Sequence, residues 1–305
     1  MSLNVCLLQS LLEVGDFEQA QDIILESPTC AAVTGGSYNS LPLLVALMHK
    51  PPLCFIEALI HAYPDALSIK NDVGMLPLRV AIRNEASNDV IMKLMNAYPD
   101  AVSAVGVSGK TCLHLACTHH VDSTVIDRLL QIWPQAAACR DGQGWYPLHM
   151  ASLCKDSDTT IRAVLAAYPD AALVTCSSDG ELPLHLAALQ GASLDTLRAL
   201  HEANPEAVTV RTHTHGWLPL HLACSQRKAW PDSIQFLVQV YRDGAKFRGK
   251  HSGALPLHIA AKNGCAPQVL DILVEAYPAA MTMKNNAGET PVANDASHYL
   301  LEVAH

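Results

Sequence analysis

The sequence predicts an all-α fold, an α-solenoid in which stacked helix pairs are joined by β-hairpin-like loops. One observation is a Leu-Pro-Leu-His phrase whose proline recurs every 35 to 37 residues over most of the 305-residue chain. These anchor positions are Pro42, Pro77, Cys112 (in the same slot), Pro147, Pro183, Pro219, Pro256 and Pro291. Another is a Tyr-Pro phrase whose proline follows most anchors by 22 residues, as at Pro64, Pro99 and Pro169. Two markers in constant register indicate a repeat protein.

The composition agrees with a long array of packed repeats. Hydrophobic residues make up 50% of the chain and charged residues 16%, which excludes a disordered chain. Aromatic residues make up only 5%, so small and aliphatic side chains must fill the core between closely stacked helices. The net charge of −9 argues against nucleic acid as a partner, because phosphate binding needs a basic surface.

The N-terminal stretch and the cysteines indicate the compartment. The first residues carry no basic segment, and no run of 18 apolar residues occurs, so we expect neither a signal peptide nor membrane insertion. Ten cysteines occur without any Cys-x-x-Cys spacing, and the chain has no Asn-x-Ser/Thr sequon. This pattern favours a reducing, cytoplasmic compartment.

Residues 1–32 predict a degenerate N-terminal cap, which keeps a helix pair but lacks the Leu-Pro-Leu-His phrase. Gly15 and Asp16 separate the two helices, and the second resumes at Phe17–Leu25. In the first helix, the apolar residues expected on one face are Leu3, Cys6, Leu7, Leu11 and Leu12.

Residues 33–288 predict seven full repeats, each made of a hairpin, a short helix and a second helix. In the repeat anchored at Pro183, the turn before the anchor contains glycine, which supplies positive φ. Proline suits the first helical turn, so we expect a helix at Pro183–Gln190, ended by Gly191, and a second at Leu194–Ala203. Residues 289–305 predict an incomplete final repeat or C-terminal cap, so that residues 1–305 form a single domain.

These phrases closely resemble the ankyrin repeat. Gly109-Lys110-Thr111-Cys112-Leu113-His114-Leu115-Ala116 and Gly288-Glu289-Thr290-Pro291 match the family's core pattern best, and the resemblance covers about residues 33–300. The period is 35 to 37 residues rather than 33, and Tyr-Pro-Asp-Ala mostly replaces the family's Gly-Ala-Asp. The resemblance implies that partners bind a concave surface formed by the hairpin tips and the exposed side of each first helix.

A histidine recurs in one slot of the repeat, at His114, His149, His185, His221 and His258. Stacked helices lie about 10 Å apart, whereas zinc holds its ligands at about 2 Å, so these residues cannot share a metal ion. The resemblance implies a structural role, in which each histidine bonds the backbone of adjoining turns. The pairs His119-His120 and His213-x-His215 lack an obvious third ligand, so we expect no metal.

The chain contains no combination of residues typical of catalysis. Ala104 to Thr111 ends in Gly-Lys-Thr, like a phosphate-binding loop. However, Ala104 replaces the first glycine, no parallel-sheet unit precedes the stretch, and Gly109 and Thr111 belong to the repeat's own pattern. Gly-x-Ser-x-Gly and His-Glu-x-x-His are both absent. We therefore expect neither enzymatic activity nor a cofactor.

The candidate partner-binding residues occupy hairpin positions that the repeat does not require. Trp145 and Trp217 share one such slot, and exposed tryptophan beside charged residues is typical of an interface hot spot. Alternatively, each ring merely covers its own hairpin. The predicted set is Arg140, Asp141, Gln143, Trp145, Asp179, Glu181, His213, His215, Trp217, Lys250 and His251.

Residues 211–251 form a basic zone on an acidic protein, with seven cationic side chains against two acidic ones. This zone could dock an acidic or phosphorylated segment; alternatively it is a solvated face of one or two repeats. The sequence therefore predicts a monomeric, non-catalytic adaptor that binds a segment of an unidentified protein. The alternative is a targeting or regulatory arm cut from a larger enzyme or channel.

Overall fold

The computed structural model describes residues 3–35, 40–119, 121–154, 158–176, 179–226 and 229–291, and within them it contains α-helices and short 3-10 turns but no extended strand. The all-α prediction is confirmed. The α-helices are α1 (Leu3–Val14), α2 (Phe17–Glu26), α3 (Pro42–Ala46), α4 (Leu53–Ala62), α5 (Pro77–Arg83), α6 (Asn88–Ala97), α7 (Cys112–Thr118), α8 (Ser123–Ile132), α9 (Pro147–Leu153), α10 (Asp158–Ala167), α11 (Pro183–Gln190), α12 (Leu194–Ala203), α13 (Pro219–Cys224), α14 (Pro231–Val240), α15 (Pro256–Lys262) and α16 (Pro267–Ala276). The 3-10 turns are η1 (Pro28–Ala32), η2 (Pro64–Ser68), η3 (Pro99–Ser103), η4 (Pro134–Ala138), η5 (Pro169–Leu173), η6 (Pro205–Val208), η7 (Arg242–Lys246) and η8 (Pro278–Thr282).

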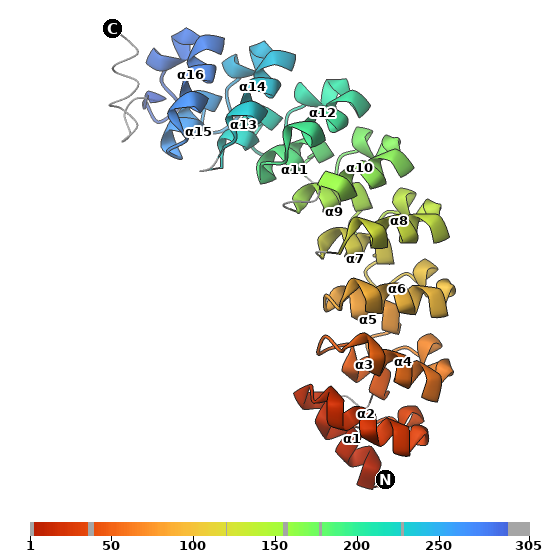
Figure 1. Cartoon of the computed structure of the whole chain (residues 1–305). Helices are drawn as coiled ribbons and strands as arrows, with labels where there is room; N and C mark the ends of the chain where they lie inside the picture. Colours follow the sequence, from red (N-terminus) through yellow and green to blue (C-terminus); the bar gives the residue numbers. More distant parts are fainter. Residues whose placement is uncertain are drawn as a thin grey trace. The chain divides into compact units, whose positions relative to one another are not determined.

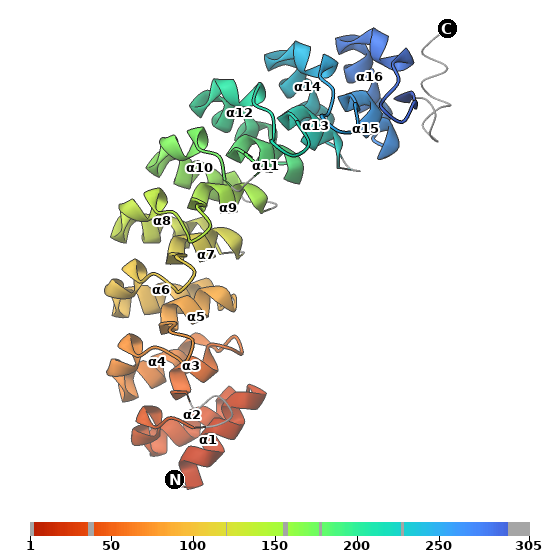
Figure 2. The ribbon, with the colours of Figure 1, turned by 180° about the vertical axis from the view of Figure 1, so that it is seen from behind.

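The chain divides into two compact units, each with two layers of helices. In unit 1 (Met1–Gly142), the odd-numbered helices pack on one another in chain order and the even-numbered helices form the second layer (Figure 1). Unit 2 (Gln143–His305) has the same arrangement, with α9 to α15 and α10 to α16 as its layers (Figure 2). Each odd-numbered helix also packs on the even-numbered helix that follows it, so one helix pair forms one repeat.

Proline and glycine set the helix ends as the sequence predicts. The helices expected at Pro183–Gln190 and Leu194–Ala203 are α11 and α12, residue for residue. Gly191 ends α11 in the left-handed conformation, with φ of +71°. The Tyr-Pro phrase has a local cause as well: Tyr98 caps α6 and Pro99 begins η3, where its missing N–H leaves no bond unmade.

The buried face of α1 differs from the predicted one. The helix buries Val5, Leu8, Gln9 and Leu12. Of the predicted face, Leu3 and Leu7 are 83% and 47% exposed, so only Leu12 is common to both. Because α1 is apolar on most sides, its periodicity does not define one face; packing against α2 and α3 selects the face that contains Gln9. The Gln9 amide donates to the Ser40 carbonyl at 3.4 Å.

The hairpin-like loops form a second connection between repeats. Several loops close on themselves through a backbone bond, such as Thr212 N–H to Trp217 O at 2.9 Å. An amide of one loop then donates to a carbonyl of the loop before it. These inter-repeat bonds are Gly142 N to Ser108 O (2.7 Å) in unit 1, and His213 N to Asp179 O (2.6 Å), Lys250 N to His215 O (2.7 Å) and Asn286 N to Ser252 O (2.9 Å) in unit 2.

Candidate partner-binding surface

The recurring histidines hold adjoining backbone together. In unit 2, Nδ1 of each ring accepts the amide hydrogen of the residue that caps its helix, at 3.2 Å in every repeat. The opposite ring nitrogen, Nε2, then donates to a carbonyl of the following loop region. These bonds run from His149 to Val174 (2.8 Å), His185 to Val210 (3.0 Å), His221 to Phe247 (3.0 Å) and His258 to Glu289 (3.2 Å).

Burial favours the neutral form of His185, His221 and His258 by lowering their pKa values. Burial lowers the pKa of His185 to about 4, against the backbone hydrogen bonds that favour the charged ring. Burial likewise lowers the pKa of His221 to about 4, and the nearby Arg211 charge adds to this effect. A neutral ring supplies one donor and one acceptor, which is the pairing that the two backbone bonds require. The histidine slot is therefore structural.

Arg79 occupies the histidine slot of its repeat, and the prediction from sequence missed it. Its side chain is only 4% exposed, and Nη1 donates to the carbonyls of Ala104 (3.2 Å) and Lys110 (2.8 Å). Within the described residues, Nε has no hydrogen-bond partner and the guanidinium has no carboxylate partner. The sequence does contain a signal for Arg79, because an arginine stands there in the position where other repeats carry histidine. A buried cation without a counter-ion is a cost to folding.

We expect Arg79→His to raise the free energy of unfolding by about 1 kcal/mol, because the ring can donate to the same Ala104 carbonyl without burying a charge. Urea unfolding of the full chain measures the change. Arg79→Met is the matched control. It removes the charge but also the side-chain donor to that carbonyl, so it should destabilise the chain; equal effects of the two substitutions would contradict the explanation.

Trp145 and Trp217 are half-buried, which corrects the expectation that they are exposed. The Trp217 ring stacks on His221 at 6.4 Å between centroids and lies 5.2 Å from His215. Trp145 lies 6.2 Å from His149. Each tryptophan stands two residues before an anchor proline, so the loop returns its ring onto the histidine of the same repeat. One face of the Trp217 ring covers His221, whereas the Trp145 ring is tilted by 58° to His149, and both tryptophans stay partly accessible.

Asp141 is buried, so it cannot contact a partner as predicted. Its side chain is 6% exposed. The position of Asp141 in its repeat, six residues before the anchor proline, explains this burial. Asn71 and Asn285 stand at the same position in their own repeats, and each accepts amide hydrogens from its own loop. A side chain in this slot therefore faces its own hairpin. Arg140 beside it is exposed, as is Gln143 in unit 2.

Successive hairpins of unit 2 bring several predicted residues together. The Asp179 carboxylate accepts the Thr214 amide at 2.6 Å, and Lys250 Nζ donates to the His213 carbonyl at 3.3 Å. Burial opposes ionisation of Asp179, but the hydrogen bonds from Thr214 and the electrostatic effect of His215 and His213 outweigh it and lower the pKa of Asp179. Burial, helped by the Asp179 charge, raises the pKa of Glu181. His213, His215, Lys250 and His251 are exposed.

A pocket of about 320 Å³ lies between these hairpins and the odd-numbered helices of unit 2. Trp217 forms part of its wall and His258 contributes to its lining. Lys262 and Glu289 add one charge of each sign, and Asn263 adds an amide group. We call this the Trp217 pocket. Its residues come from positions spread between 217 and 291, so no local motif could have revealed it.

The basic zone contains a second, more open pocket of about 770 Å³. Arg211, Lys246, Arg248 and Lys250 all line it, and we call it the basic pocket. Of the other predicted cations, Arg242 donates to the Glu275 carbonyl at 2.8 Å. Arg227 and Lys228 lie outside the described residues.

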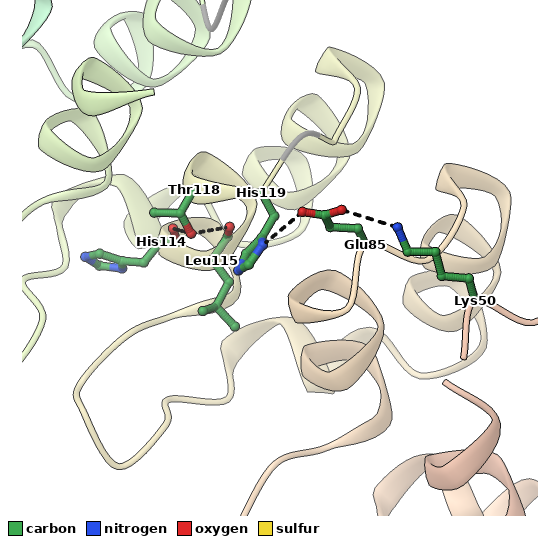
Figure 3. Close-up of polar contacts among 6 residues, drawn as sticks. All are labelled: Lys50, Glu85, His114, Leu115, Thr118 and His119. Atoms are coloured by element: carbon green, nitrogen blue, oxygen red, sulfur yellow. Dashed lines mark hydrogen bonds and ion pairs between the residues drawn. The ribbon is translucent and has the colours of Figure 1, made fainter. Parts of the chain in front are cut away.

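Unit 1 has a row of charged side chains at the ends of its odd-numbered helices, which the sequence pattern did not reveal. Lys50 Nζ and His119 Nδ1 lie 3.3 Å and 3.7 Å from the two carboxylate oxygens of Glu85 (Figure 3). The Lys50 hydrogen bond and charge lower the Glu85 pKa. The residues are partly exposed, so such pairs add little stability. His120, the other half of the predicted histidine pair, lies outside the described residues.

Membrane spans and metal clusters are both absent from the part of the chain that the structure describes. None of its helices combines the length and the hydropathy that crossing a membrane requires. No group of three histidine, cysteine or acidic side chains is gathered there in a way that could hold a metal ion.

Comparison with known proteins places these features in a known architecture. Residues 184–285 match the family model "Ankyrin repeats (3 copies)". No curated protein sequence matches the chain significantly. Among solved structures, the ankyrin repeat domain of Bcl-3, described as a member of the IkappaB family, is similar with a TM-score of 0.52 and 23% identity, over 79% of this chain and 99% of that one. The human ASB11 ankyrin repeat domain has a TM-score of 0.56 and 19% identity, over 74% and 96%. A chain from the complex of the endopeptidase Bd0816 of Bdellovibrio bacteriovorus with the immunity protein Bd3460 has a TM-score of 0.51 and 20% identity, over 64% and 96%.

Proposed function

We propose that the chain is a non-catalytic adaptor that binds a segment of another protein, because residues 184–285 match ankyrin repeats and the similar solved structures include ankyrin repeat domains. Ankyrin repeats generally serve as protein interaction modules, and one structural neighbour comes from a complex between two proteins. We assign the binding surface to unit 2, on the side where the hairpins meet the odd-numbered helices.

The Trp217 pocket is the observation that carries this proposal. Its volume of about 320 Å³ is enough for one or two side chains. The accessible part of the Trp217 ring offers apolar contact, while Asn263, Lys262 and Glu289 can bond the backbone and side chains of a bound segment. A rigid aromatic wall beside polar groups is the composition of an interface hot spot. Trp217 would therefore act as the anchor.

The environments of the thiols favour a binding role over catalysis. Burial raises the pKa of Cys112 to about 11, against the nearby Arg79 charge. Burial also raises the pKa of Cys224 well above its usual range. A nucleophilic cysteine needs the opposite shift, because the thiolate is the reactive form. Buried, reduced thiols also favour the proposed reducing, cytoplasmic compartment.

We expect Trp217→Ala to lose the partner selectively. In affinity capture from native cell extract, Trp217→Ala should retain about tenfold less of the proteins that the wild-type chain binds, or even less. Truncating a hot-spot residue costs about 2 kcal/mol of binding free energy, which is roughly thirtyfold in affinity. Trp230→Ala is the matched control, since Trp230 is 61% exposed and lies outside both pockets. Capture of the same proteins at the same levels by all three chains would exclude this pocket. Circular dichroism establishes first that each variant is folded.

A further inference from the structure

The basic pocket adjoins the Trp217 pocket through one shared hairpin. Gly249, Lys250 and Gly253 line the basic pocket, whereas Ser252 and Ala254 of the same loop line the Trp217 pocket. A protein segment that occupies one pocket therefore needs to pass only this loop to reach the other. The two pockets differ in charge, because the basic pocket has four cationic side chains and one acidic side chain in its lining.

Two of the four cations are held in place by backbone carbonyls. Arg211 donates through Nε to Gly216 O at 3.1 Å and through Nη2 to Arg248 O at 3.0 Å. Arg248 repeats the pattern one repeat later, with Nη1 donating to Gly253 O (3.3 Å) and Lys284 O (2.8 Å). These bonds fix both guanidinium groups before any ligand arrives, which reduces the entropy lost on binding.

Each fixed guanidinium keeps donors for a ligand. Among the described residues, no acceptor contacts Nη1 of Arg211 or Nε and Nη2 of Arg248. The Phe247 ring lies 5.7 Å from the Arg211 guanidinium carbon and further restricts that side chain. A planar guanidinium with free N–H groups is suited to an oxyanion with several oxygens.

The two lysines add mobile charge at the rim. Lys246 Nζ lies 2.7 Å from Asp243, an exposed ion pair that an incoming anion can replace. Lys250 is exposed, and its side-chain ammonium donates to the His213 carbonyl over a long 3.3 Å. Both ammonium groups can therefore turn toward a ligand at little cost.

We propose that the basic pocket binds the phosphorylated side chain of a protein segment whose neighbouring part occupies the Trp217 pocket. This inference rests on the proposed adaptor function. A phosphoryl group carries a charge of about −1.5 to −2 and three acceptor oxygens, which matches two guanidinium and two ammonium groups better than the two oxygens of a carboxylate do. The chain as a whole has a net charge of −9, which disfavours binding of a long polyanion such as nucleic acid.

The test uses the full chain on arrays of peptides with degenerate flanks around a fixed central residue. The central residue is phosphoserine, phosphothreonine, phosphotyrosine, aspartate or serine. We expect at least one phosphorylated array to bind about tenfold more tightly than the serine array, because the phosphoryl group accepts charge-assisted hydrogen bonds that serine cannot accept. Serine and phosphorylated arrays that bind equally would overturn the proposal. Aspartate binding as tightly as phosphate would also overturn it, because charge alone would then suffice.

A double variant, Lys246→Gln with Lys250→Gln, tests the pocket without touching the arginines that bond the hairpins. It should abolish most of the preference for phosphorylated peptides and leave the serine array unchanged. Lys284→Gln is the control, an exposed lysine whose side chain does not line either pocket. A phosphate preference that survives the double variant would overturn the assignment.

Trp217→Ala on the same arrays separates this inference from the adaptor proposal. It should weaken binding to every array by the same factor, since the Trp217 pocket does not recognise the phosphate. Loss on all arrays with no phosphate preference would leave the adaptor function standing and remove the present inference. Binding to vesicles that contain a phosphoinositide, with no binding to any peptide, would assign the pocket to a lipid headgroup and also overturn it.

Discussion

The free energy of unfolding should fall by about 3 kcal/mol for each of His185 and His221 as the pH falls from 6.5 to 4. Burial holds the pKa of each ring at about 4 in the folded chain, whereas an exposed histidine has a pKa near 6.5. Between these values the unfolded chain binds one more proton per histidine than the folded chain. The stabilisation is therefore complete above pH 6.5, and its loss ends below pH 4.

Urea unfolding followed by tryptophan fluorescence measures this effect, because Trp217 stacks on His221 in the folded state. The His185→Asn and His221→Asn double variant provides the comparison. It should be less stable than the wild-type chain at neutral pH, since four buried backbone bonds lose their ring partners. Below pH 6.5, however, its stability should decline less steeply. Parallel pH curves for the two proteins would contradict the assignment of acid sensitivity to these rings.

The helices could be predicted from sequence because their limits have local causes. A proline at the first helical position and a left-handed glycine such as Gly191 act within a few residues, so α11 and α12 begin and end where the pattern predicts. The buried face of α1 has no local cause. Its sequence is apolar on most sides, and only contact with α2 and α3 decides that Leu8 is buried and Leu3 exposed.

The candidate site was predicted only in outline. The hairpin positions near Trp217 and Lys250 do line pockets in unit 2. The direction of individual side chains was not predictable, because it depends on where each residue stands in the loop: Asp141 turns inward, although Arg140 next to it is exposed. The pockets themselves combine residues from successive repeats, so they exist only after stacking. Arg79 was visible in the sequence as an exception to the histidine slot.

Gly109→Ala should lower the free energy of unfolding by about 3 kcal/mol. Gly109 has φ of +73°, a conformation that costs a residue with a side chain about 1 kcal/mol. The added Cβ would also lie 2.6 Å from the Gly142 nitrogen and 3.0 Å from the Asp141 carbonyl carbon. Both are backbone atoms of the next hairpin, which must therefore move.

That movement would break a bond between repeats, since the same Gly142 nitrogen donates to the Ser108 carbonyl at 2.7 Å. Gly74→Ala separates the two contributions, because Gly74 has φ of +76° but a Cβ added there would meet no heavy atom within 4 Å. Gly74→Ala should therefore lower the free energy of unfolding only by the cost of the left-handed backbone conformation, about 1 kcal/mol. Urea unfolding of both variants, with far-ultraviolet circular dichroism as the signal, gives the difference directly.

The difference between these two variants measures how strongly hairpins couple one repeat to the next. In a solenoid, stability is the sum of each repeat's own stability and the interfaces between neighbours. If Gly109→Ala lowers the free energy of unfolding more than Gly74→Ala does, the hairpins contribute to the stability of the interface between repeats in addition to the helix packing. It would also explain the glycine of the Gly-Lys-Thr stretch as a site of close backbone approach rather than of phosphate binding. Equal losses would mean that the hairpin bond contributes nothing measurable and that helix packing alone joins the repeats.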